Sequence, residues 1–177
     1  MINRVGGLQG FMMMCLQMFK GGLLMRFLKA LMIVFWVDTA AAELANYSVA
    51  IQTPEGKQSF YQLELAATSS ARQKGLMHRY DLGNVDGMLF VWPDEDYRNF
   101  WMKNTPLSLD ILFFSSHLTL VSRHENTVPF SAKLLPSGKP ARYVVELKAG
   151  QAELRGIKKG SLLILPKALM RVLDIKS

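Results

Sequence analysis

The sequence predicts a mainly β domain, borderline with α+β: an antiparallel β-sandwich or flattened barrel with one or two short helices. Most apolar stretches are short and rich in β-branched and aromatic residues, and several alternate with polar residues as half-buried strands do. Turn residues separate these stretches at short spacing, while helical patterns are few and brief. The chain contains no internal repeat, linker or low-complexity segment.

The first elements form a hairpin followed by a helix. Residues 47–52 and 60–65 alternate in hydrophobicity on either side of the turn residues Pro54-Glu55-Gly56, which predicts two paired strands. Residues 68–77 have the pattern of a short helix, and residues 149–155 have the pattern of one further helical turn.

Six more short strands complete the predicted sheet. They are expected at residues 87–92, 100–103, 107–114, 118–122, 142–147 and 161–165. Proline, glycine and acidic residues make 93–96 and 136–140 the predicted surface loops.

The first 42 residues differ from the rest and have the order of an export signal. Arg26 and Lys29 precede the apolar run 30–37, which is too short to span a bilayer. Ala40-x-Ala42 fits the small-residue rule for signal cleavage. We therefore expect cleavage near Ala42, leaving a periplasmic or secreted domain of residues 43–177.

The length of this segment leaves two alternatives open. A signal of 42 residues is long, and Met25 would begin one of ordinary length, so Met25 is a candidate true start. The other alternative is an uncleaved N-terminal membrane anchor. Contact with a membrane is expected only in that case.

Charge and cysteine content exclude several function classes. Of 21 Lys/Arg and 14 Asp/Glu, four and one lie in the first 42 residues, which leaves 17 against 13, or +4, on the mature domain. These bases are scattered, so nucleic-acid binding is not expected. The only cysteine, Cys15, lies in the predicted signal, which excludes disulfides and thiol catalysis from the mature domain. No phosphate loop or metal-binding motif is present, so neither a cofactor nor a bound metal is expected.

A set of ordered motifs resembles one known family. The motifs are Arg72-x-x-Gly75-Leu-Met77-x-Arg79, Gly87-Met-Leu-Phe90, Phe100-Trp-Met-Lys-Asn-Thr105, Leu109-Asp110, Tyr143-Val-Val-Glu-Leu147 and Gly156-Ile-x-x-Gly160. Over about residues 47–165 they resemble the domain of unknown function 192 family, small domains often found behind an export signal. The chain departs from the family at Ser161, where an acid is usual. The resemblance implies a mostly β fold and no established activity.

Lys103 and Asp110 are the first candidate site residues. Alternation along 107–114 places Asp110 on a face with apolar side chains, which predicts partial burial. Lys103 precedes it across the bend formed by Asn104, Thr105 and Pro106. The pair suits either acid–base chemistry in a site or a structural ion pair that fixes the bend. The sequence leaves both interpretations open, and Asn104 has the same two interpretations.

Three further charged residues complete the candidate ligand-binding set. Arg72 lies on the predicted helix, where its guanidinium could bind a carboxylate such as Glu146, or an anionic or sugar-like ligand. Arg79 offers the same chemistry. We expect a site near the 101–105 bend, lined by Arg72, Arg79, Lys103, Asn104, Asp110 and Glu146. No residue is assigned a catalytic role.

The sequence favours a non-catalytic exported domain that binds a small ligand or an envelope partner. Clustered polar residues in an apolar setting, without a recognisable catalytic set, motivate this hypothesis. The first alternative is a hydrolase or lyase acting on an envelope or carbohydrate substrate, with Asp110 or Glu146 as base and Lys103 as electrostatic stabiliser. The second is a metal-handling accessory protein. Whether the protein is an enzyme remains open at this stage.

Overall fold

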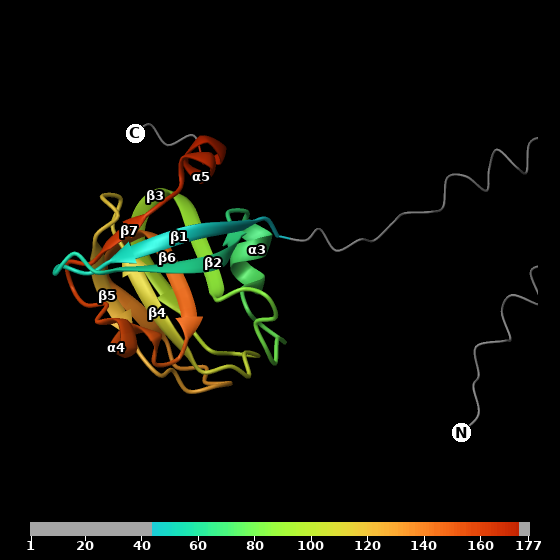
Figure 1. The fold of residues 1–177 in the computed structure, drawn as a ribbon. Coiled ribbons are helices and arrows are strands. Elements are labelled where there is room, and N and C mark those ends of the chain that lie inside the picture. The colour runs from blue at the N-terminus through green and yellow to red at the C-terminus, as the bar shows by residue number, and fades with distance from the viewer. Residues whose placement is uncertain (1–43, 174–177) are drawn as a thin grey trace, which may run out of the picture. The chain divides into compact units, whose positions relative to one another are not determined.

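A seven-stranded sheet organises the part of the chain that the structure describes (Figure 1). The computed structural model describes residues 44–173, and the predicted signal with its cleavage site lies outside them. The strand order is β5-β4-β6-β3-β2-β1-β7, and all neighbouring strands are antiparallel except the parallel pair β2 and β3. The strands are β1 (Asn46–Gln52), β2 (Gln58–Ala66), β3 (Gly87–Phe100), β4 (Leu109–Phe114), β5 (Leu120–His124), β6 (Leu135–Lys148) and β7 (Leu162–Ile164).

Three short helices accompany the sheet in the described range. They are α3 (Ser69–Lys74), α4 (Gln151–Arg155) and α5 (Lys167–Val172). Thr68 begins α3 because its hydroxyl accepts a hydrogen bond from the Ala71 amide at 3.1 Å. None of these helices is long and apolar enough to cross a membrane.

The two outer strands of the sheet meet, which makes it a nearly closed barrel. Thr119, just before β5, forms a bridge with Leu162 of β7. The Leu120 amide also donates to the Ser161 carbonyl at 2.8 Å. The predicted mainly β fold is therefore confirmed, in its flattened-barrel form, and it carries one helix more than the one or two expected.

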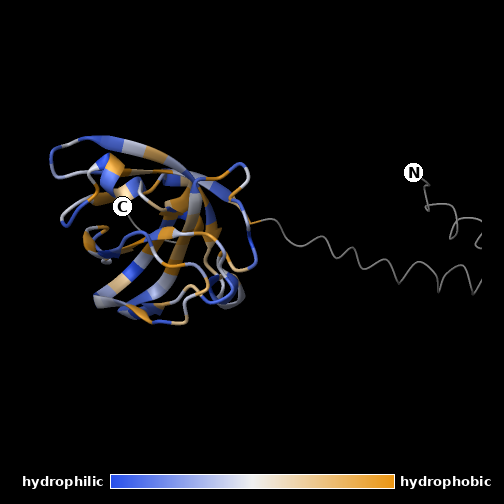
Figure 2. Ribbon diagram, turned by 90° about the horizontal axis from the view of Figure 1, so that it is seen from below, coloured by the Kyte–Doolittle hydropathy of each residue, from blue (hydrophilic) through white to orange (hydrophobic). Residues whose placement is uncertain are grey.

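Apolar side chains pack on both faces of the central strands. Every residue of β4 is buried. Leu112 and Phe114 contribute to one core, whereas Ile111 and Phe113 contribute to the other. Figure 2 shows hydrophobic stretches gathered in the middle of the sheet and hydrophilic ones mostly in its outer parts. A polar side chain on these strands therefore points into a core or into a cavity.

The antiparallel pair of β3 and β6 is longer than the sequence predicts. Residues 93–96 and 136–140 lie inside these strands rather than in loops, and residues 101–103 lie outside any strand. Register shifts between Val91 and Asp96 and between Tyr97 and Asn99 accommodate the prolines, which cannot donate to a ladder. These bulges turn the end of β3 toward α3.

Gly87 should be intolerant of any side chain, because β6 passes close to it. A Cβ at this position would lie 1.8 Å from the Glu146 carbonyl oxygen. We expect Gly87→Ala to destabilise the domain by about 3 kcal/mol, as overpacking a core does. Denaturant unfolding measures this effect. Gly138→Ala is the control: a Cβ there meets open space, so only its positive φ costs about 1 kcal/mol. Equal effects of the two substitutions would contradict the expectation.

Candidate functional site

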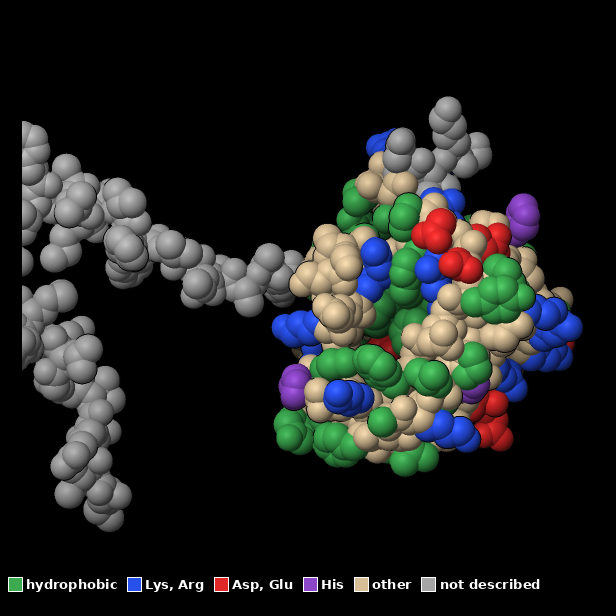
Figure 3. Space-filling model, turned by 180° about the vertical axis from the view of Figure 1, so that it is seen from behind, with side chains coloured by type: hydrophobic (Ala, Val, Ile, Leu, Met, Phe, Trp, Pro, Cys, Tyr) green, Lys and Arg blue, Asp and Glu red, His purple; other side chains and the backbone are tan. Residues whose placement is uncertain are grey.

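A pocket of about 170 Å³ opens between α3, the bulged end of β3, the segment after β3 and β6. Its apolar lining includes Phe90, Trp92, Phe100 and Trp101. Its polar lining includes Arg72, Gln73, Lys74, Asn99, Thr105 and Glu146. Figure 3 shows a hollow on the face seen from behind, with hydrophobic side chains around it and acidic atoms at depth.

Glu146 is the unusual residue of this pocket. It faces Met88 of β3 and Ile111 of β4 across the sheet, so its side chain shares their apolar face. The residue is only 5% exposed, and its Oε2 has no hydrogen-bond partner. Burial raises the pKa of this carboxyl to about 8, because the charged form has lost its water. At neutral pH the pocket therefore contains a neutral carboxyl group that can both donate and accept a hydrogen bond.

The aromatic lining is held in place by edge-to-face packing. The rings of Phe90 and Phe100 lie 5.2 Å apart between centroids, and the rings of Trp92 and Phe100 lie 6.1 Å apart. Phe100 also meets Phe113 of the core at 5.5 Å. Such contacts add stabilisation beyond area burial, so the pocket wall is rigid.

Arg72 is fixed at the pocket by the backbone rather than by an acid. Its Nη1 donates to the Val91 carbonyl at 2.8 Å and to the Ala67 carbonyl. The guanidinium carbon lies 5.3 Å from the centroid of the Trp92 ring, and that of Arg98 lies 4.7 Å from it. Burial, and after it the charge of Arg98, lower the pKa of Arg72. The Arg72–Glu146 bond that the sequence allowed is not among the hydrogen bonds of the described residues.

Asp110 lies on the opposite face of the sheet from Glu146. It is paired with Leu147, and it is fully buried. Its Oδ1 accepts from the Asn126 amide at 2.9 Å and its Oδ2 from the Ala152 amide at 2.8 Å. The Asp110 carboxylate therefore ties β4 to the segment after β5 and to α4, which is a structural role.

Lys103 and Asn104 lie on the surface of the bend. Both are exposed, and Lys103 forms no ion pair with Asp110 or any other acid of the described residues. Asn104 has a positive φ of 57°, a conformation that asparagine tolerates. Its carbonyl accepts from the His78 amide at 2.7 Å, so Asn104 braces two loops.

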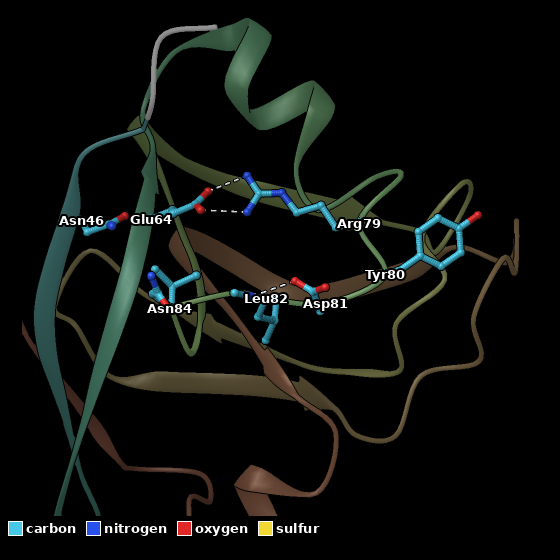
Figure 4. A pocket seen from close by; sticks show the side chains of 9 residues that line it. Asn46, Glu64, Arg79, Tyr80, Asp81, Leu82 and Asn84 are labelled. Carbon is cyan, nitrogen blue, oxygen red and sulfur yellow. Dashed lines mark hydrogen bonds and ion pairs between the residues drawn. The ribbon is translucent and has the colours of Figure 1, made fainter. Parts of the chain in front are cut away.

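Arg79 lines a second and larger depression of about 350 Å³ (Figure 4). Its guanidinium forms two hydrogen bonds with Glu64, at 2.7 and 2.6 Å. This bond to Glu64 raises the pKa of Arg79. Tyr80 points away from the pair. Because both charges are already satisfied, the depression offers a ligand no unpaired group from them.

The six candidate residues are therefore distributed over several places. Of the six, only Arg72 and Glu146 line the same pocket, and Thr105 of the bend lines it as well. Sequence reasoning missed Gln73 and Asn99, and no sequence signal marks them, since their place depends on the α3 and β3 geometry. No group of three or more His, Cys, Asp or Glu residues within 44–173 is arranged to hold a metal ion.

The same fold and motifs occur in known proteins. A family model, DUF192, described as "Uncharacterized ACR", matches residues 50–165. The chain belongs to the DUF192 family. The predicted family resemblance is thus confirmed. No curated protein matches the chain.

Two solved structures are similar to this DUF192 protein. One is a protein from Sinorhizobium meliloti 1021 described as a candidate transcription regulator, with 38% identity and a TM-score of 0.66 over 69% of this chain and 95% of that one. The other is a protein of unknown function from Novosphingobium aromaticivorans DSM 12444, with 34% identity and a TM-score of 0.65 over 70% of this chain and 88% of that one. The matched region makes up almost the whole of the first of these proteins, so that protein folds without a further domain.

Asp110→Asn should destabilise the protein while Lys103→Met should not. The side-chain NH2 group of asparagine would face one of the two backbone N–H groups, so one hydrogen bond to the charged carboxylate is lost. Loss of such a bond lowers the free energy of unfolding by about 2–3 kcal/mol. Lys103 is exposed, so its loss should change the free energy of unfolding by less than about 0.5 kcal/mol. Urea unfolding of both variants measures this difference. An equal loss in both would contradict the structural role assigned to Asp110 alone.

Glu146 should make the protein less stable as the pH rises. The folded protein keeps this proton up to about pH 8, whereas the unfolded chain releases it near 4.5. The stabilising contribution is therefore complete below about pH 4.5 and is lost by about pH 8. At 1.36 kcal/mol for each pKa unit, it amounts to about 5 kcal/mol.

Unfolding of the wild type and of Glu146→Gln across this pH range measures that contribution. The variant should lack the decline, because glutamine does not titrate. Glu153→Gln, at an exposed position of α4, should keep it. Parallel curves for the wild type and Glu146→Gln would disprove the shift.

Proposed function

We propose that this DUF192 domain binds a small uncharged molecule with hydroxyl or amide groups, such as a single sugar ring, in the pocket of Glu146. The observation that carries the proposal is the buried Glu146 carboxyl, whose Oε2 has no hydrogen-bond partner among residues 44–173. Leaving a buried polar atom unbonded costs about 1–3 kcal/mol, and a ligand that bonds it recovers this free energy.

The charges of the pocket favour a neutral ligand. The other charged residues that line it are Arg72 and Lys74, so an ammonium group entering the pocket meets two like charges. A carboxylate that reaches Glu146 would lose its water there, and neither Arg72 nor Lys74 would compensate for this loss, because burial alone sets the Glu146 pKa and neither cation contributes to it. A hydroxyl or amide group instead matches the donor and acceptor of the neutral acid.

The remaining lining supports a flat, hydroxylated ligand of small size. Trp92 and Trp101 offer aromatic surface, while Asn99, Gln73 and Thr105 offer polar groups. This mixture of apolar walls and a few polar groups is typical of small-molecule sites. The volume of about 170 Å³ is below the roughly 300–1,000 Å³ typical of larger ligands, which favours one ring.

Binding is favoured over hydrolysis. Glycoside hydrolysis by the usual route requires two carboxyl groups on the same substrate. Glu146 is the only acid among the residues that line this pocket, and Asp110 points to the other face of the sheet. Metal handling is also disfavoured, because Met88 and Met102 lie buried in the core.

The cellular location of the domain is argued from the sequence alone. We propose that the domain acts in the periplasm or outside the cell, with residues 1–42 removed on export. The basic, apolar and small-residue order of that segment supports this proposal.

A series of sugars that differ in charge tests the proposed ligand class. N-acetylglucosamine and glucose carry no charge, glucosamine carries an ammonium group and glucuronate carries a carboxylate. The protein used is the domain of residues 43–177. We expect the neutral sugars to shift the NMR signals of the residues that line the pocket, and to bind with affinities at least about tenfold higher than those of the charged sugars. Tighter binding of glucosamine would overturn the neutral class. Absence of any perturbation by all four would overturn the sugar ring as ligand.

The role of Glu146 is tested by the pH dependence of that binding. Affinity for the neutral sugar should be constant below about pH 7 and should fall as the pH rises through about 8, where the carboxyl ionises. Glu146→Gln should bind with no such fall, because its amide also offers a donor and an acceptor. Glu153→Gln should behave as the wild type. A fall that persists in Glu146→Gln would assign the effect to another group.

A further inference from the structure

Two surface segments beside the pocket are joined by backbone hydrogen bonds. The Met102 amide donates to the Ser131 carbonyl at 2.9 Å, and the Phe130 amide donates to the Thr105 carbonyl at 3.0 Å. Figure 1 shows these segments, residues 101–107 and 125–134, together at the lower end of the barrel. They form a continuous edge of the domain.

This edge exposes large apolar side chains. Val128 is 69% exposed and Phe130 is 60% exposed, and Leu134 of the same segment and Trp101 of the other segment are also exposed. We call these four residues the apolar edge. At the lower end of the view in Figure 3, hydrophobic side chains gather with Lys or Arg among them. Contiguous exposed apolar residues are typical of contact surfaces.

The backbone holds Phe130 in an unfavourable conformation. Its φ is 60°, in the left-handed region that phenylalanine rarely adopts. The bond of its amide to Thr105 fixes this geometry, while its ring stays in solvent. Strained residues that persist at a surface are found at functional positions, because a strain-free residue would otherwise serve there. We therefore take the exposed ring of Phe130 as the group for which this strained backbone is retained.

The unpaired charges around the apolar edge have one sign. Residues 101–107 and 125–134 contain two lysines, Lys103 and Lys133, and one acid, Glu125, which lines a shallow depression with Val128 and Lys133. Both lysines are exposed. The Glu125 carboxylate is paired with Arg123 at 3.2 Å, so its charge is already compensated. An approaching surface therefore meets apolar groups and two free ammonium groups.

We propose that the apolar edge docks the domain onto an anionic lipid bilayer. Phe130 and Val128 would enter the interface between headgroups and acyl chains, while Lys103 and Lys133 remain at the anionic headgroups. Apolar side chains with lysines around them are the combination that binds such interfaces. The two lysines complement anionic headgroups, and the exposed apolar side chains match the acyl region directly beneath those headgroups, so a lipid surface fits both features of the edge. Val128, Phe130, Lys103 and Lys133 do not line the pocket, whereas Trp101 borders both the pocket and the apolar edge.

Vesicle co-sedimentation of residues 43–177 tests the docking. Vesicles of phosphatidylcholine alone are compared with vesicles containing phosphatidylglycerol and phosphatidylcholine in equal parts. We expect binding to the anionic vesicles only. The double variant Val128→Ser, Phe130→Asn should bind at least about tenfold more weakly. Asparagine tolerates the left-handed region, so the melting temperature should not fall.

Two further variants make the test specific. Phe60→Ser removes an equally exposed phenylalanine of β2, outside the apolar edge, and should bind vesicles as the wild type does. Lys103→Gln with Lys133→Gln should weaken binding and reduce its dependence on salt. No binding of the wild type to anionic vesicles would overturn the proposal, as would equal binding by the Val128 and Phe130 double variant. Neither result would affect the ligand proposal.

Discussion

The central strands β3, β6 and β4 are covered on both faces, and this constraint decides what each polar side chain on them can do. A carboxyl group on these strands is not hydrated. Its charge must be stabilised by hydrogen-bond donors of the protein, or the group is protonated and neutral, or a ligand must supply the missing hydrogen bond. Asp110 follows the first course, with two backbone amides. Glu146 follows the second, one strand away, because its face of the sheet offers no donor to Oε2. The same burial thus produces a structural carboxylate and a neutral acid in a pocket.

The pocket itself depends on how irregular β3 is. Beyond Val91 its pairing with β6 shifts twice, and this turns Asn99 and Phe100 toward α3. Arg72 then holds the helix to the strand through the Val91 carbonyl, so the helix closes one side of the pocket. Regular pairing of β3 with β6 along their whole length would leave Glu146 covered by a flat layer of side chains. The bulges are therefore as important to the site as the residues that line it.

Much of the fold could be predicted from residues close together in the sequence. Alternation at residues 47–52 and 60–65 locates β1 and β2, because a half-buried strand shows its period directly. The prediction of a loop at residues 93–96 is wrong, since proline and three acids usually indicate a loop, whereas the pairing of Asp96 with the distant Ala141 continues β3 beyond the bulge. Local signals cannot include that pairing.

The candidate site was predictable only in part, for the same reason. Burial of Asp110 follows from the pattern of its own strand, but its partners, the Asn126 and Ala152 amides, are set by tertiary structure. Lys103 lies close to Asp110 in sequence, yet the turn at Asn104 leaves it in solvent. Glu146 was identified as a candidate from sequence, whereas its lack of a partner depends on which face of β6 it occupies.

The pairing of β1 with β7 has a consequence for how the chain acquires its structure. Ile51 and Leu163 lie side by side in the sheet, although they come from opposite ends of the domain. Contacts between residues so far apart in sequence form slowly, because the intervening chain must be ordered first. The barrel cannot close until its last strand has been synthesised. A polypeptide with this topology keeps an open edge at β1 until the chain has been synthesised through β7.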